Sequence, residues 1–575
     1  MHTRDVIAML WELHALTVLD EGSPQSFKAR AYEKAVAAIE SAGVDVTSMD
    51  KKELTALDGV GGSTADKILE FLATGTVDKI ERLRALYPPE FVALSKIPGV
   101  GPKTLKALRA ELGIENLDDL KAAIASEQLR TVPGLGKTSE EKIAMAIERL
   151  GMHGKDRRTP IAEAMDVAVR MVADLEVLDG VSRVQYCGSL RRFAETIGDV
   201  DITVAADDPA RVMEAVRTHR VATEVMAAGD TKTSILTREG LQIDVRVVSP
   251  QQFGAAILYF TGSKAHNIEL RQRAIDRQML LNEYGLFTTD DQLVASETEA
   301  SIYTALELDF IEPPLREGAG EIAAAANGNL PELVRRADIR GDLHFHTDWS
   351  GDGRSSLEDM VQAAVDAGYQ YVAITDHGED LAINGLSRER MVEHRDRVRN
   401  LEQQRGDIRL LFGCELNIGP DGSLDYDPEF RAMFDWCVAS VHSAFDLSAE
   451  EQTARLIKAI SDPSVNAVGH LTGRYIGRRP GIELDLDSVL EALQVSGVGL
   501  EVNGALERLD ASSSVVRRAV GAGVRLVLST DSHHVNDLVR MQFGVWNAQR
   551  GWAERSDVAN TVATAEFETW AASRF

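Results

Sequence analysis

The sequence has few cysteines, no long apolar run and no excess of basic charge. Its three cysteines, Cys187, Cys414 and Cys437, lie far apart, which excludes a zinc finger and argues against a disulfide framework. No stretch approaches the roughly 18 consecutive apolar residues of a membrane span. The first residues, MHTRDVIAML, lack the continuous apolar core of a signal peptide. We therefore expect a cytoplasmic protein that does not enter a membrane.

The net charge, the length and the positions of the histidines indicate what the chain can bind and how it is divided into domains. The formal net charge of −28 opposes long-range attraction to nucleic acid, although backbone amides and local basic patches can still bind phosphates. The 575 residues are enough for several domains. Eight of the 13 histidines lie after residue 340, so metal chemistry is expected in the C-terminal part.

Three segments near the N-terminus repeat one pattern: LDGVGGSTADKI (57–68), IPGVGPKTLKAL (97–108) and VPGLGKTSEEKI (132–143). In each, a Gly-x-Gly turn precedes a predicted helix, so that free backbone N–H groups and the helix dipole can bind a phosphate. These segments resemble the helix-hairpin-helix motifs of repair enzymes, which bind the DNA backbone without reading its sequence. The glycines expected at the DNA are Gly59, Gly61, Gly99, Gly101, Gly134 and Gly136.

A group of acidic residues follows in residues 187–204, CGSLRRFAETIGDVDITV. Asp199 and Asp201 alternate along a predicted strand, so their carboxylates share one face. Asp244, in the strand-like LQIDVRVV, can add a third carboxylate. Such a set can hold two Mg²⁺ ions about 3.5–4 Å apart for phosphoryl transfer. The Gly188-Ser189 turn can contact a phosphate.

The next segments resemble family X DNA polymerases, the group that includes eukaryotic polymerase beta. YFTGSKAHN (259–267) resembles their nucleotide-binding turn, and LLNEYGLF (280–287) and IYTALELDFIEPPLRE (302–317) resemble their closing subdomain. The resemblance implies that Asp199, Asp201 and Asp244 bind two Mg²⁺ ions, with Asp244 nearest the primer 3′-hydroxyl. It places further residues around the incoming nucleotide: Ser189 and Arg192 at the triphosphate, Tyr259, Phe260 and Gly262 at the sugar, and Asn267 and Arg271 on the minor-groove side.

Two positions depart from that family. Phe193 stands where vertebrate members have glycine, and Lys264 stands where polymerase beta has an acidic residue. Contacts to the base pair can therefore differ, while the three aspartates are retained.

The first hairpin also resembles the small lyase domain of polymerase beta. By that resemblance Lys67 is the lysine that forms a Schiff base with deoxyribose phosphate, and Tyr32 and Lys28 match neighbouring positions. A nucleophilic lysine needs a lowered pKa. Ser63 replaces a lysine of the family pattern, which removes one source of that lowering; the alternative is a solvated lysine on a DNA-facing helix.

The C-terminal part contains histidines and acids at the ends of predicted strands. GDLHFHTDWSGDG (341–353) places two histidines on one face of a strand, and further candidates follow other apolar strands, where parallel α/β barrels have their active sites. The pattern resembles the PHP (polymerase and histidinol phosphatase) domain, a distorted β/α barrel with up to three metal ions, and mixed imidazole and carboxylate ligands suit Mn²⁺, Zn²⁺ or Fe²⁺. The nine matching positions are His344, His346, Asp352, His377, Glu415, His442, His470, Asp531 and His533.

One of these nine positions is ambiguous. The family's Ser-Asp-Gly reads Ser350-Gly351-Asp352-Gly353 here, one residue longer. Asp352 is the preferred ligand, and Asp348 is the alternative.

The sequence thus predicts a multidomain chain. The fold class is N-terminal all-α helix-hairpin-helix domains, an α+β nucleotidyltransferase palm and a C-terminal distorted β/α barrel. The expected parts are a lyase-like DNA-binding domain (1–86), a fingers-type subdomain (87–155), the palm (156–250), a closing subdomain (251–317), an Ala/Gly/Asn-rich linker (318–338) and the PHP domain (339–575).

The two resemblances imply a DNA polymerase that fills short gaps during repair and carries a PHP 3′–5′ exonuclease. Abasic-site cleavage and lyase activity are additional possibilities. Expected partners are gapped or nicked DNA and deoxynucleoside triphosphates, with two Mg²⁺ at the polymerase site, Mn²⁺ or Zn²⁺ at the PHP site, and a monomeric chain. Two alternatives are a Mn²⁺-dependent 3′ nuclease with weak polymerase activity and a DNA-end-binding scaffold. The three hairpins disfavour a phosphatase of small metabolites.

Overall fold

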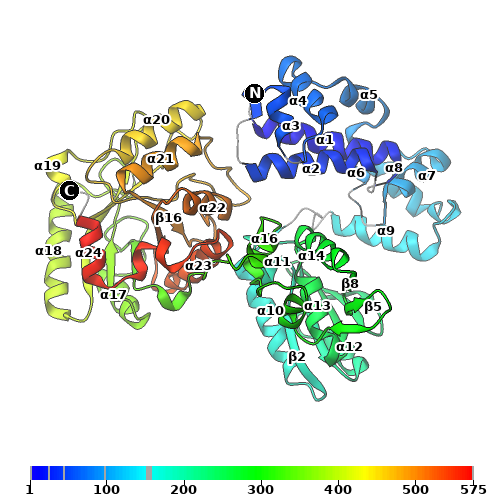
Figure 1. The fold of residues 1–575 in the computed structure, drawn as a ribbon. Coiled ribbons are helices and arrows are strands. Elements are labelled where there is room, and N and C mark those ends of the chain that lie inside the picture. Colours follow the sequence, from blue (N-terminus) through cyan, green and yellow to red (C-terminus); the bar gives the residue numbers. More distant parts are fainter. Residues whose placement is uncertain are drawn as a thin grey trace. The chain divides into compact units, whose positions relative to one another are not determined.

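The computed structural model describes residues 3–23, 26–42, 46–57, 59–95, 97, 99–150, 158–381 and 383–572. The chain divides into two compact units, Met1–Arg157 and Arg158–Phe575 (Figure 1), and each is considered by itself.

The N-terminal unit is helical (Figure 1, blue to cyan). Its α-helices are α1 (Thr3–Glu21), α2 (Phe27–Ala42), α3 (Lys51–Ala56), α4 (Gly62–Thr74), α5 (Asp78–Leu86), α6 (Pro89–Leu94), α7 (Pro102–Leu112), α8 (Leu117–Ala125) and α9 (Lys137–Leu150). Their apolar faces form two separate cores, one built on α1 to α5 and the other on α6 to α9. Two small cores in succession agree with a tandem of hairpin domains.

Each repeated Gly-x-Gly segment forms a turn before a helix. Gly59, Gly99 and Gly134 adopt positive φ angles of 106°, 87° and 85°, which glycine adopts without steric cost. At Gly59 a Cβ atom would lie 3.0 Å from the carbonyl oxygen of Lys34, so a side chain is also excluded by packing. The second glycine of each pair directly precedes α4, α7 or α9.

The second unit begins with the palm. Helix α10 (Ile161–Glu176) packs against a five-stranded sheet whose order is β2-β4-β7-β6-β5. The strands are β2 (Val181–Tyr186), β4 (Asp199–Ala206), β5 (Glu224–Ala228), β6 (Lys232–Leu236) and β7 (Gln242–Val248). The short β1 (Thr159–Pro160) and β3 (Thr196–Ile197) pair with each other, and α11 (Gly188–Arg191) and α12 (Pro209–Arg217) complete the palm.

The closing subdomain follows the palm. Its elements are α13 (Phe253–Thr261), α14 (Lys264–Asp276), a sheet of β8 (Met279–Asn282), β9 (Gly285–Thr288) and β10 (Leu293–Ala295), and α15 (Glu299–Ala305). The stretch expected to be a linker, in part helical, packs against the core of the closing subdomain. It contains α16 (Glu321–Ala326), whose buried Glu321 accepts a hydrogen bond from His266 at 2.8 Å. Composition alone gave no sign of this buried pair.

The C-terminal part is a parallel barrel of seven strands in sequence order. They are β11 (Gly341–Phe345), β12 (Tyr371–Ile374), β13 (Arg409–Asn417), β14 (Trp436–Ser440), β15 (Ala467–Val468), β16 (Gly499–Asn503) and β17 (Leu526–Ser529). The helices between them are α17 (Leu357–Asp366), α18 (Arg388–Arg405), α19 (Pro428–Arg431), α20 (Ala449–Ile460), α21 (Leu486–Ser496) and α22 (Ser513–Gly521), and α23 (Met541–Arg550) follows β17. Several of these helices surround the strands in Figure 1. The predicted fold class is confirmed.

Alternate residues of each barrel strand face inward and outward. Val372 and Ile374 pack outward, while Tyr371 and Ala373 join an inner core with Trp436. Phe567 of the last helix, α24 (Thr564–Ala572), packs into that inner core. The barrel closes because the backbone N–H of Asp531 donates to the carbonyl of His344 at 2.9 Å and that of His346 donates to Ser532 at 2.8 Å. No helix among the described residues is long and apolar enough to cross a membrane.

Candidate active sites

The three palm aspartates lie on two adjacent strands. β4 and β7 pair in parallel, and their register sets Asp201 directly opposite Asp244 and Asp199 opposite Gln242. Because residues two apart on a strand share a face, Asp199 also lies on the side of the other two carboxylates. Gly188 must lack a side chain here, since a Cβ atom would lie 2.8 Å from Oδ2 of Asp201.

Burial and mutual repulsion disfavour the charged forms of two of these three carboxylates. Burial and the neighbouring charges of Asp199 and Asp244 raise the pKa of Asp201 to about 7, and burial and Asp244 also raise the pKa of Asp199. Asp244 differs: burial alone would raise its pKa, but hydrogen bonds from Lys232 and Gln242 lower it. Nζ of Lys232 lies 2.5 Å from Oδ2 of Asp244. Divalent cations would neutralise the same repulsion.

Lys232 was not identified from the sequence. Its place beside Asp244 depends on the antiparallel pairing of β6 with β7, which sets Lys232 opposite Arg246 and Ser234 opposite Asp244. No local motif carries that information.

The turn around Ser189 is joined to the closing subdomain by two arginines. Arg191 donates to both carboxylate oxygens of Glu299 at 2.8 and 2.7 Å. Arg192 donates to the carbonyl oxygen of Thr261 at 2.5 Å and to Glu317 at 3.2 Å. The Ser189 turn and Gly262 are therefore adjacent, as is required if the first binds the triphosphate and the second contacts the sugar of the same nucleotide. A Cβ atom at Gly262 would lie 3.3 Å from Arg192 Nη1.

The residues expected around the sugar and the minor groove also come together. Tyr259, Asn267 and Arg271 line one small cavity with Asn282. The Asn267 amide donates to the carbonyl of Tyr259 at 2.8 Å, and the Arg271 guanidinium lies 5.1 Å from the Tyr259 ring centroid. The next ring, Phe260, lies under the guanidinium of Arg246 at 4.4 Å.

Lys67 lies on α4 and forms an ion pair with Glu70 at 2.6 Å. Both side chains are about a quarter exposed, at 25% and 24%, so the pair is weak, in the range of about 0–1 kcal/mol. Tyr32 instead contacts Lys79, whose Nζ lies 3.3 Å from its hydroxyl. Burial and the charge of Lys28 lower the pKa of Lys79, a lysine that the sequence pattern did not single out.

All nine PHP-type positions gather at the carboxyl ends of the barrel strands. Eight of them form three groups in which one ligand atom of each residue lies within 4.8 Å of the others: His346, Asp352, His377 and His533; His344, His346 and Asp531; His377, Glu415 and His442. The ninth, His470, contacts Glu415 at 2.9 Å. The palm aspartates form no group this tight; among the described residues, every such group lies in the barrel.

The contacts within this cluster are short, as is expected of side chains that share metal ions. Nε2 of His344 and Nε2 of His346 lie 3.2 Å apart. Nδ1 of His377 lies 3.0 Å from a carboxylate oxygen of Glu415, and Nε2 of the same ring lies 3.1 Å from Oδ2 of Asp352. Asp352 Oδ1 is buried and has no hydrogen-bond partner. Two nitrogens facing each other and an unpaired carboxylate oxygen are what metal ligands show.

Buried residues outside the nine orient these side chains. Glu501 accepts a hydrogen bond from Nδ1 of His344 at 2.6 Å, and Asn417 contacts Nδ1 of His442 at 2.6 Å. Such partners fix the ring orientation of metal-binding histidines. Neither residue was predicted from the sequence, although Asn417 lies on the same strand as Glu415 and Glu501 lies on a strand next to the one that Asp531 follows.

The structure distinguishes between Asp352 and Asp348, the two candidate ligands in the lengthened turn. Asp352 Oδ2 lies 3.1 Å from His377 Nε2 and 3.5 Å from His533 Nε2, whereas Asp348 is exposed. The turn is tight at Gly353, where a Cβ atom would lie 1.8 Å from the Thr347 carbonyl oxygen. The extra residue is accommodated before Asp352 reaches the cluster.

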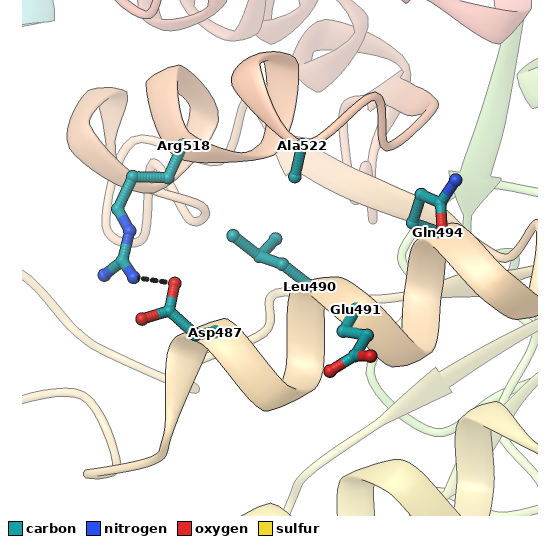
Figure 2. A pocket seen from close by; sticks show the side chains of 6 residues that line it. All are labelled: Asp487, Leu490, Glu491, Gln494, Arg518 and Ala522. Atoms are coloured by element: carbon teal, nitrogen blue, oxygen red, sulfur yellow. Dashed lines mark hydrogen bonds and ion pairs between the residues drawn. The ribbon is translucent and has the colours of Figure 1, made fainter.

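A cavity of about 370 Å³ lies away from this chemistry, between α21 and α22 (Figure 2). Arg518 and Asp487 form an ion pair across it, and Leu490 and Gln494 line its floor. None of the nine predicted ligands contributes to its lining.

The palm with its closing subdomain and the metal-type cluster of the barrel define the class: a polymerase beta-like nucleotidyltransferase joined to a PHP domain. Comparisons with known proteins agree. Residues 256–317 match the DNA polymerase beta thumb, 342–505 the PHP domain, 1–77 a helix-hairpin-helix domain and 91–149 a SAM-like helix-hairpin-helix tandem.

Curated relatives give the same result. The chain is 35% identical over 575 residues, 99% of both chains, to a protein of Bacillus subtilis (strain 168) named DNA polymerase/3′-5′ exonuclease PolX. It is 23% identical over 323 residues to DNA polymerase lambda of Rattus norvegicus, covering 51% of this chain and 52% of that one. A probable phosphatase of Acetivibrio thermocellus is 30% identical over 203 residues, 33% of this chain and 78% of the relative. The chain belongs to the bacterial family X DNA polymerases with a C-terminal PHP domain.

Proposed function

We propose that this protein is a two-site enzyme that extends DNA primers at its palm and removes 3′ nucleotides at its PHP domain. The observation that carries the first activity is the register that sets Asp201 opposite Asp244 on adjacent parallel strands. The second rests on nine ligand-type side chains that converge at one end of the barrel. Three hairpins of the kind that binds DNA backbones favour a DNA substrate for both sites.

At the palm, Asp199, Asp201 and Asp244 would hold two Mg²⁺ ions, whose charge stabilises the attacking and leaving oxygens of a phosphoryl transfer. The residues themselves fit cations, because two of the three carboxylates have raised pKa values that a nearby positive charge would reverse. Asp244 keeps a lowered pKa and can accept a hydrogen bond from the primer hydroxyl. Ser189 and Arg192 bind the triphosphate, and Tyr259 packs against the sugar.

At the barrel, the donor set of imidazoles and carboxylates fits Mn²⁺ or Zn²⁺, up to three ions. These ions supply Lewis acidity and lower the pKa of bound water. Glu501 and Asn417 hold His344 and His442 in the required orientation. The fit is carried by the facing imidazole nitrogens of His344 and His346 and the unpaired oxygen of Asp352.

Metal analysis tests the assignment of Asp352. Asp352→Asn should lower the Mn²⁺ affinity of the barrel at least about tenfold, because a ligand with two histidine neighbours loses its charge. Isothermal titration with Mn²⁺ measures this. Asp348→Asn is the matched control, since Asp348 is exposed on the same turn. An affinity that falls with Asp348→Asn and not with Asp352→Asn would reverse the assignment.

Two other functions predict different results with the same protein. A nuclease that merely delivers DNA ends would digest strongly with Mn²⁺ yet extend primers weakly at saturating triphosphate. A DNA-end-binding scaffold would bind gapped DNA and keep that binding after chelation, with no activity to lose. Product analysis on gapped DNA with Mg²⁺ and Mn²⁺ compared separates all three.

The N-terminal unit supports a second candidate activity, removal of deoxyribose phosphate through Lys67. The weak ion pair with Glu70 leaves this amine available to a sugar aldehyde. Lys67→Ala should reduce the adduct trapped by borohydride on a 5′-deoxyribose-phosphate substrate at least about tenfold, since a Schiff base needs an amine. Lys79→Ala is the control. Loss of the adduct in that variant alone would transfer the role to Lys79, which is half-buried.

Gapped or nicked DNA and deoxynucleoside triphosphates are the proposed partners. A monomeric, cytoplasmic enzyme acting in short-gap repair, with abasic-site cleavage as an additional activity, is proposed on the same grounds.

A further inference from the structure

Phe193 has a backbone conformation that usually calls for glycine. Its φ is 58°, and it directly follows Arg192 in the turn proposed to bind the triphosphate. A non-glycine residue in this region is strained unless its surroundings hold it there. The side chain stacks on Trp546 of α23, with ring centroids 4.3 Å apart and an interplanar angle of 11°. The departure from the vertebrate pattern noted above therefore places an aromatic ring against the PHP domain.

Trp546 is part of a larger apolar contact. Its ring meets Phe543 edge-on at 5.1 Å, and both pack against the palm core together with Ile476. Leu509, at 3% exposed, belongs to that same core although it follows β16 of the barrel. The palm core is thus completed by side chains of the PHP domain.

A charged contact lies beside the aromatic one. Oε1 of Glu317 accepts a hydrogen bond from Arg192 at 3.2 Å and from Arg550, the last residue of α23, at 3.1 Å. Arg192 and Arg550 are 14% and 15% exposed, so water screens the three charges only partly. Arg550 shares the carboxylate that would otherwise be available to Arg192 alone.

A second ion pair holds the far end of the same turn. Arg474 donates to Glu195 at 2.6 Å and to the carbonyl of Arg508 at 2.8 Å. Arg474 follows His470, one of the nine cluster residues. The turn proposed to bind the triphosphate therefore contacts the barrel domain at three residues: directly at Phe193 and Glu195, and through Glu317 at Arg192.

We infer that the PHP domain is a structural part of the polymerase site, in which Trp546 and Arg550 are positioning residues for Arg192. This inference rests on the proposed role of Arg192 at the triphosphate. A guanidinium held before the ligand arrives loses less conformational freedom on binding. Removing the support weakens nucleotide binding without removing any group that contacts the reacting atoms, so KM rises more than kcat falls.

The test is steady-state single-nucleotide insertion on gapped DNA with the full-length protein. Trp546→Ala should raise KM for the nucleotide about tenfold and Arg550→Gln about three- to tenfold, with kcat within about twofold of the unmodified enzyme. Trp546→Phe should restore KM because a ring remains on Phe193. Arg518→Gln is the matched control: Arg518 also lies on a barrel helix, and it pairs with Asp487 at the cavity of Figure 2, whose lining contains no palm residue.

Digestion of single-stranded DNA by the PHP site is the readout of an intact barrel. Unchanged KM in both Trp546→Ala and Arg550→Gln, with digestion retained, would overturn the inference. A parallel fall of kcat, digestion and thermal stability in both variants would also overturn it, because the residues would then serve only the fold. Arg192→Gln distinguishes a failure of this inference from a failure of the proposed function. If Arg192→Gln leaves KM for the nucleotide unchanged, Arg192 does not bind the triphosphate.

Discussion

Replacing Asp199 and Asp201 together by alanine should reduce primer extension on gapped DNA by about 10³-fold or more. These two carboxylates lie on one face of β4, with Asp201 opposite Asp244. Metal ions in such sites contribute several kcal/mol to transition-state stabilisation, and each 1.36 kcal/mol corresponds to about tenfold in rate. Denaturing gels of primer extension with Mg²⁺ measure the loss.

The control for this variant is Asp207→Ala, an exposed carboxylate just beyond the other end of β4. It should extend primers at the normal rate. Digestion of single-stranded DNA should persist in the double variant, since the barrel ligands are untouched. Primer extension by the double variant at the normal rate would disprove the polymerase assignment at this site.

Replacing His344 and His346 together by alanine should abolish Mn²⁺-dependent 3′ digestion, again by about 10³-fold or more, because two of the three ligand groups lose a member. The assay is the release of 3′ nucleotides from labelled single-stranded DNA. Primer extension should continue. Metal content should fall in the same variant, which connects the lost activity to the lost ions.

His534→Ala is the matched control, because it removes an imidazole next to His533 that belongs to no ligand group. The side chain of His534 caps the short helical turn Val535–Arg540 by accepting a hydrogen bond from the backbone N–H of Asn536. Digestion that survives in the His344/His346 variant would locate the nuclease elsewhere on the chain or in a contaminant.

Most residues of the two candidate sites could be predicted from the sequence because their positions follow from local patterns along the chain. Asp199 and Asp201 share a face by strand alternation alone, and histidines after apolar strands come together once the strands are parallel neighbours in a barrel. The residues that were missed depend on contacts between distant segments. Lys232 reaches Asp244 through a hairpin pairing, and Glu501 of β16 meets His344 of β11 only because the barrel closes.

Phe193 shows the limit of a family pattern. The sequence identified it as a departure, but nothing near it in the chain indicated why a ring replaces glycine. Its partner, Trp546, belongs to a different domain. Similarly, the Ala/Gly/Asn-rich stretch after residue 318 suggested a linker, in part helical, and its composition did not indicate the buried contact between Glu321 and His266.

The closure of the barrel has a consequence for how this domain is held together. His344 and His346 belong to the first strand and its exit, and Asp531 follows the last, so one ligand group spans the seam at which the two ends of the sheet meet. An ion bound there would act as a clasp between segments distant in sequence, and a ligand that binds only the folded state raises its stability. Chelation would then lower the stability of the barrel as well as abolish its activity. In a cell short of the metal, the enzyme would therefore unfold more readily in addition to being less active.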